Sequence, residues 1–72
     1  MKNLPDLKSG TNCRVTWVVG EYAQALKNMF DLDVDTKLHI LNSDPGGNVI
    51  VCYGGHELAI SYDVARQVKV EL

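Results

Sequence analysis

The stretch VIVCYGGHELAIS, residues 49–61, decides the fold because two apolar segments flank a pair of glycines. A two-residue Gly-Gly loop suits a type I′ hairpin turn, in which both central residues take a positive φ that glycine accepts freely. With Gly54 and Gly55 as the loop, Tyr53 pairs with His56, and the register of both strands is fixed. The remaining pairs are then Cys52 with Glu57, Val51 with Leu58, Ile50 with Ala59, and Val49 with Ile60.

The period of two gives this hairpin an apolar face and a reverse face. The apolar face consists of Val49, Val51, Leu58 and Ile60, with Tyr53 and His56 at its outer end. The reverse face consists of Ile50, Cys52, Glu57 and Ala59. Cys52 and His56 therefore point to opposite sides of the ribbon, and a zinc site would need three or four ligands. We expect no metal site within the hairpin.

The segment CRVTWVV, residues 13–19, also alternates and predicts the first strand. Its expected core face is Cys13, Val15, Trp17 and Val19. Upstream, Leu4 and Leu7 are expected to cover one end of the core, and Gly10 marks the turn into the strand.

After Gly20 the apolar period changes to that of a helix, which is predicted over residues 21–32. The large apolar residues on one face of this helix are Tyr22, Leu26, Met29 and Phe30. A stripe of Met and aromatic residues is usually packing and only occasionally a binding face, so the core interpretation is favoured and the other stays open.

Two more segments complete the predicted sheet. KLHIL, residues 37–41, alternates with Leu38 and Ile40 pointing inward. After the hairpin and a short segment, YDVAR, the last strand QVKVEL is predicted over residues 67–72. Its expected inward residues are Val68, Val70 and Leu72. The chain is thus predicted to be one mainly β domain, residues 1–72, with five antiparallel strands and one inserted helix in a small barrel whose closure hides the strand edges.

Composition excludes several function classes. The 72 residues are 46% hydrophobic and 22% charged, as in an ordinary globular domain, and the net charge of -2 comes without a basic stripe for nucleic acid. The longest apolar run, VIVCY, is far shorter than the roughly 20 residues that span a bilayer, and the first ten residues lack the apolar block of a signal peptide. We expect a cytoplasmic protein without membrane insertion. Cys13 and Cys52 are expected to be reduced thiols, with a disulfide between them as the alternative.

The acidic segment DLDVD, residues 31–35, begins like a calcium-binding loop. Such a loop needs Gly at its sixth position and Glu at its twelfth, where this chain has Thr36 and Asn42. The segment is better interpreted as a helix end and turn, with Asp33 in the left-handed conformation.

Catalytic motifs are not found either. None of the serines lies in a nucleophile motif, no Cys-His-Asp or paired-carboxylate arrangement follows from the spacing, and DPGGN lacks the Lys-Ser/Thr of a phosphate-binding loop. We expect no catalytic residue, no cofactor and no enzyme activity.

The order of these segments resembles the FeoA family over most of the chain, from the lead-in LPDLKSG to the closing YDVARQVKV. The resemblance implies an SH3-like barrel with a helix after the first strand. It also implies a small cytosolic accessory of bacterial ferrous iron uptake that binds the cytoplasmic GTPase region of the FeoB transporter. Similar modules are fused to transporters or end metal-dependent repressors.

The chain departs from the family pattern at two places. After the helix the family typically has Leu-Gly-Leu and a Pro-Gly turn, where this chain has Leu32, Asp33 and Val34 and a shortened turn. The family usually has an arginine directly after the strand that corresponds to LAI, residues 58–60, and this chain has Ser61 at that position. Gly54, by contrast, matches the hairpin glycine of the family, and Ala65 matches its small residue in the last short turn.

Two function classes stay open at this point. The first is a non-catalytic module that docks on a FeoB-like transporter through apolar residues left outside the barrel, namely Tyr22, Phe30, Ile50 and Tyr53. The second is a direct transition-metal carrier or sensor that uses His39, His56, Cys52 or the Asp31, Asp33, Asp35 cluster. Docking is favoured because scattered ligands bind a metal weakly. The sequence does not predict an oligomeric state.

Overall fold

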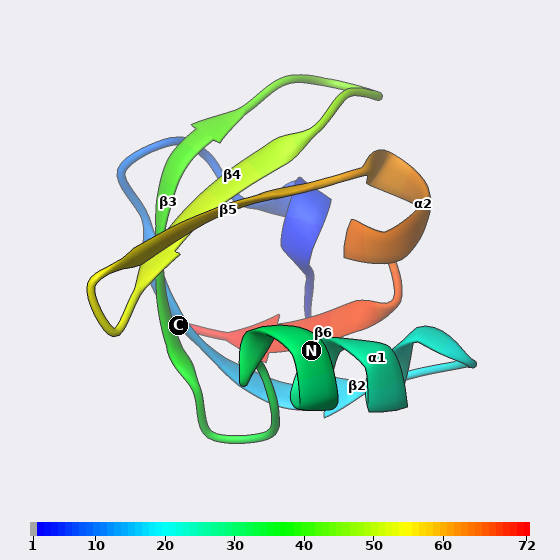
Figure 1. The fold of residues 1–72 in the computed structure, drawn as a ribbon. Coiled ribbons are helices and arrows are strands. Elements are labelled where there is room, and N and C mark those ends of the chain that lie inside the picture. The colour runs from blue at the N-terminus through cyan, green and yellow to red at the C-terminus, as the bar shows by residue number, and fades with distance from the viewer. Residues whose placement is uncertain (1) are drawn as a thin grey trace.

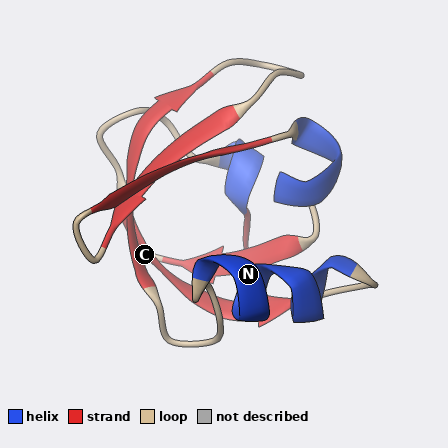
Figure 2. Cartoon of the chain, in the orientation of Figure 1, coloured by secondary structure: helices blue, strands red, loops and turns tan. Residues whose placement is uncertain are grey.

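The computed structural model describes residues 2–72 as one antiparallel sheet curled around an aliphatic core (Figures 1 and 2). The strands run in the order β1-β6-β2-β3-β4-β5. Their bounds are β1 (Lys2–Asn3), β2 (Asn12–Val18), β3 (Lys37–Ser43), β4 (Val49–Tyr53), β5 (His56–Ile60) and β6 (Val68–Glu71). The helices are the 3-10 helix η1 (Leu4–Asp6), α1 (Tyr22–Phe30) and α2 (Tyr62–Ala65).

The β4–β5 hairpin has the predicted register throughout, from Tyr53 opposite His56 to Val49 opposite Ile60. Gly54 and Gly55 have φ values of 54° and 80°, as a type I′ turn requires. The prediction holds because a tight turn and a period-two pattern each fix the same register.

The core consists of aliphatic side chains and one thiol that the curled sheet and the helices enclose. They are Leu4, Leu7, Cys13, Val15, Val18, Leu26, Leu32, Leu38, Ile40, Val49, Val51, Ile60, Ala65, Val68 and Val70. The inward positions predicted for β3 and for the lead-in residues Leu4 and Leu7 are confirmed.

The strand count was wrong by one, since six strands are present in residues 2–72. The additional strand, β1, pairs Lys2 with Val70 and Asn3 with Lys69. Two residues are too few to show an alternating period, so no pattern could indicate this strand. The barrel has two free edges, because β1 and β5 are the ends of the sheet and are not neighbours in the strand order.

The predicted core face of the first strand is wrong beyond Val15. A β-bulge shifts the register between Val15 and Trp17, so Trp17 is 57% exposed and Val18 is buried instead. The extra residue is Thr16, whose Oγ1 donates a hydrogen bond to the Lys69 carbonyl oxygen at 3.1 Å. The last strand also ends early, so Leu72 is 77% exposed and not inward.

Helix α1 ends two residues earlier than predicted because Asp31, and not Asp33, takes the left-handed conformation at φ 56°. The chain reverses there, and the Leu32 N–H donates to the Leu26 carbonyl oxygen at 3.1 Å. Leu32 thereby enters the core. Of the predicted helix stripe, only Leu26 is buried, and Met29 lies outside with 72% of its surface exposed.

None of the helices in residues 2–72 has the length and apolar character needed to cross a membrane.

Candidate functional site

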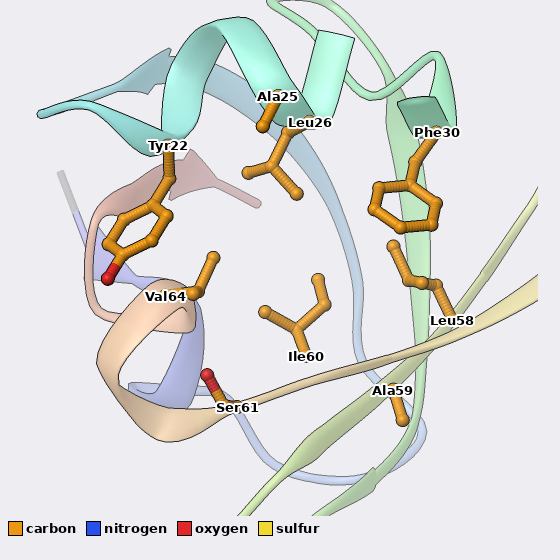
Figure 3. Close-up of a pocket in the computed structure, with 9 residues that line it drawn as sticks. All are labelled: Tyr22, Ala25, Leu26, Phe30, Leu58, Ala59, Ile60, Ser61 and Val64. Carbon is orange, nitrogen blue, oxygen red and sulfur yellow. The ribbon is translucent and has the colours of Figure 1, made fainter. Parts of the chain in front are cut away.

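An apolar groove runs between α1 on one side and β5 and α2 on the other (Figure 3). Its volume is about 310 Å³. The lining residues are Tyr22, Ala25, Leu26, Phe30, Leu58, Ala59, Ile60, Ser61 and Val64. Apart from the hydroxyls of Tyr22 and Ser61, these side chains offer apolar surface, so the groove is built for apolar contact.

The helix presents two aromatic rings that the core does not enclose. Tyr22, Leu26 and Phe30 are spaced by four residues, which places them along one side of α1. In Figure 3 all three point toward the opposite wall, where Leu58 and Ile60 project from β5 and Val64 projects from α2. Leu26 is buried, whereas Tyr22 and Phe30 are 38% and 39% exposed. The aromatic rings therefore line a cleft that is open to solvent.

The hairpin tip is fixed against the end of α1. The Tyr53 hydroxyl donates a hydrogen bond to the Phe30 carbonyl oxygen at 2.6 Å. This carbonyl belongs to the last turn of the helix, where no intrahelical N–H is available. Burial, and then the nearby negative charge of Asp31, raises the pKa of the Tyr53 phenol, which favours the protonated form that donates this bond. The contact ties the tip of the β4–β5 hairpin to the last turn of α1.

His39 and Cys52 are brought together on neighbouring strands, which the sequence did not indicate. His39 lies opposite Cys52 across β3 and β4, Asn12 lies opposite His39, and Glu57 lies opposite Cys52. The His39 Nδ1 is 2.7 Å from the Asn12 Oδ1. His56 pairs instead with Tyr53, at a ring-centroid distance of 6.2 Å. His39 and Cys52 are thus neighbours, whereas His56 does not join them.

Two of the three acidic candidates, Asp33 and Asp35, are engaged in ion pairs. Asp35 Oδ1 is 2.5 Å from Arg14 Nη1, and Asp33 Oδ2 is 3.6 Å from Lys27 Nζ. Among residues 2–72, no group of three or more His, Cys, Asp or Glu side chains is arranged to hold a metal ion. Cys13 and Cys52 are free thiols, and burial raises the pKa of the Cys13 thiol, which keeps it protonated and unreactive. Within residues 2–72, this geometry gives the metal-carrier alternative two adjacent candidate ligands, His39 and Cys52.

A family model described as the FeoA domain matches residues 2–72. The chain belongs to the FeoA family.

Solved structures with the same fold include other FeoA proteins. An iron uptake regulatory protein, FeoA, superposes with a TM-score of 0.85 at 28% identity, over 96% of this chain and 92% of that one. FeoA from Chlorobium tepidum gives a TM-score of 0.81 at 26% identity, over 99% and 70% of the two chains. No curated protein sequence matches the chain. The family places this FeoA domain in the context of iron uptake.

The fold also recurs within longer proteins. The metal-dependent transcriptional regulator MtsR gives a TM-score of 0.80 at 24% identity, over 96% of this chain but only 33% of that one. At this identity the likeness concerns the fold alone. The mainly β, SH3-like architecture predicted for this chain is confirmed by its sheet and by the likeness to the solved FeoA structures.

The four residues predicted to bind a partner do not share one surface. Tyr22 and Phe30 line the groove, whereas Tyr53 does not line it and contacts only the Phe30 carbonyl oxygen. Ile50 lies opposite Ala59 on the reverse face of the hairpin and is half-buried. The sequence missed Leu58 and Val64 as site residues, because nothing in a period-two or helical pattern tells that a core-facing side chain borders an open cleft.

Proposed function

We propose that this FeoA-family protein is a cytosolic, non-catalytic accessory of bacterial ferrous iron uptake that docks on the cytoplasmic GTPase region of a FeoB-like transporter. The observation that carries the proposal is the apolar groove with Tyr22 and Phe30 half exposed on its wall. Aromatic side chains at the centre of a desolvated contact supply most of the binding energy of typical interfaces.

The docking face in this proposal is the groove together with Tyr53, whose hydroxyl donates to the carbonyl oxygen of the groove residue Phe30. The face is concave, so a partner side chain that enters it becomes surrounded by apolar atoms. Ile50 was expected to join this face, and its position on the reverse side of the hairpin makes it the useful contrast. A partner that covers the groove does not need to touch Ile50.

The proposal is tested by measuring the affinity of the purified cytosolic domain of a FeoB-like transporter for Tyr22→Ser and Phe30→Ser. Loss of an aromatic anchor should weaken binding by about thirtyfold or more, because such residues contribute roughly 2 kcal/mol or above. The matched control is Leu41→Ser, since Leu41 is also an apolar side chain, is 40% exposed, and lies on β3 away from the groove.

Circular dichroism must show that each variant is folded. Unchanged affinity in both groove variants would contradict the proposed face. Weakened binding in Ile50→Thr with unaffected groove variants would place the contact on the reverse face of the hairpin instead.

A further inference from the structure

The two edges of the sheet are unequal. One edge is β1, which has two residues, and the other is β5, which has five. Within residues 2–72, β5 pairs with β4 on one side and with no strand on the other. An edge strand of this length carries unpaired main-chain groups, and proteins normally shorten, charge or cover such an edge.

The hairpin register identifies which groups face the free edge. Tyr53 and His56 close a two-residue loop and exchange both hydrogen bonds of their pair. Bonded and non-bonded pairs then alternate, so Leu58 and Ile60 bond to β4. The N–H and C=O groups of Glu57 and Ala59 therefore point away from β4, toward the open side.

The groove and this edge are continuous. Ala59 lines the groove, although its side chain points away from the cavity in Figure 3, so its contribution comes from the strand backbone. Leu58 and Ile60 point their side chains into the groove. A strand added beside β5 would bond to Glu57 and Ala59, and its residue opposite Leu58 would direct its side chain into the same cavity.

We propose that the partner docks by β-strand addition, as an extended segment with apolar residues at alternate positions that pairs with the β5 edge and fills the groove. The inference rests on the proposed function for the identity of the partner. The main chain of the added segment hydrogen-bonds to the backbone N–H and C=O groups of Glu57 and Ala59. Its apolar side chains contact Phe30 and Leu26. A volume of about 310 Å³ suits the few side chains on one face of a short strand.

Two other occupants fit less well. A helix satisfies its own backbone and would leave the Glu57 and Ala59 groups unpaired. A second copy would pair its own β5 antiparallel about a two-fold axis perpendicular to the sheet, which keeps both copies of α1 on the same face. The second α1 would then crowd the space beside the groove. An extended segment of a partner carries no second α1 and leaves the space beside the groove free.

The decisive variant is Ala59→Pro. Proline removes the N–H that faces the free edge, and edge strands tolerate proline where the lost N–H points to solvent, so the β4–β5 ladder is kept. The control Ala59→Val retains the N–H at the same position. We expect Ala59→Pro to weaken binding of the FeoB-like cytosolic domain by about tenfold, as the loss of one or two hydrogen bonds implies, and Ala59→Val to bind within about twofold of the unaltered protein.

Amide hydrogen exchange gives a second readout on the unaltered protein. The Glu57 and Ala59 amides should exchange fast in the free protein and become protected when the domain is bound, whereas the Leu58 amide is already protected by β4. If Ala59→Pro binds normally while Tyr22→Ser and Phe30→Ser do not, the strand-addition model is overturned and the docking function stands.

The experiment distinguishes a wrong partner from a wrong mode of binding, namely strand addition. If the FeoB-like domain does not bind at all, the proposed function fails, and a seven-residue capped peptide that alternates leucine and threonine becomes the probe. Protection of Glu57 and Ala59 by this peptide at millimolar concentration supports strand addition. Dimerisation of the protein with protection of the same amides, or no protection by either probe, overturns it.

Discussion

Tyr53 joins the hairpin to the last turn of α1 through one hydrogen bond, from its hydroxyl to the Phe30 carbonyl oxygen at 2.6 Å. Tyr53→Phe removes the donor and leaves the ring in place. We expect the free energy of unfolding to fall by about 1 kcal/mol, as is typical for a single hydrogen bond. Urea denaturation of both proteins at neutral pH measures the difference, and an unchanged midpoint would show that the bond contributes nothing.

The same bond gives a pH dependence of known sign. Because burial and Asp31 raise the pKa of Tyr53 in the folded protein, the folded state holds this proton more tightly than the unfolded state, where tyrosine has its ordinary pKa of about 10. The stabilisation is fully present below that value and is lost as the pH rises through the folded-state pKa. The stability gap between the protein and Tyr53→Phe should therefore shrink in alkaline buffer, and a gap that widens there would contradict the assignment.

At the scale of elements, the hairpin turn requires glycine because of its backbone conformation, and not because a side chain would lack room. Gly55 has φ 80° and open space where a Cβ would lie, so Gly55→Ala should cost about 1 kcal/mol through backbone strain alone. Gly54 has φ 54°, which asparagine also adopts, and Asn-Gly is a preferred type I′ pair, so Gly54→Asn should be nearly neutral. Thermal unfolding of the two variants tests this, and equal losses would show that the turn is of another type.

Elements differ in how well local sequence predicts them. The hairpin was predicted residue by residue because its glycines and its alternation agree. The first strand was predicted only as far as Val15, because the bulge at Thr16 depends on pairing with Lys69, which is far away in the sequence. The helix end was misplaced by two residues because Asp31 and Asp33 are the same residue type and only tertiary packing of Leu32 chooses between them.

At the scale of the whole molecule, Arg14 joins three segments. Its guanidinium pairs with Asp35 after α1, at 2.5 Å, and with Glu71 at the end of β6. The three side chains are 40% (Arg14), 74% (Asp35) and 51% (Glu71) exposed, so water screens the pairs. Arg14→Ala should therefore lower the free energy of unfolding by less than about 1 kcal/mol, and the loss should diminish at high ionic strength. Denaturation in low and high salt measures it, and a large loss that salt does not alter would indicate a packing role for the arginine stem.

The candidate site is a property of the whole molecule and was correspondingly difficult to predict. Tyr22 and Phe30 could be named from their period, but the wall they face comes from β5 and α2, which begin more than two dozen residues later in the chain. Ile50 was grouped with them because an apolar residue on a reverse face looks unpartnered in sequence. The fold places it on the other side of the hairpin.

The inequality of the two sheet edges limits the valency of the protein. With one edge of only two residues and the other bordered by a groove, the sheet can be extended in a single direction. Once one strand has been added at the β5 edge, the protein has no second, equivalent edge to which another strand could be added. Titrations should saturate at one partner per molecule, and an excess of either component should not drive growth into fibres.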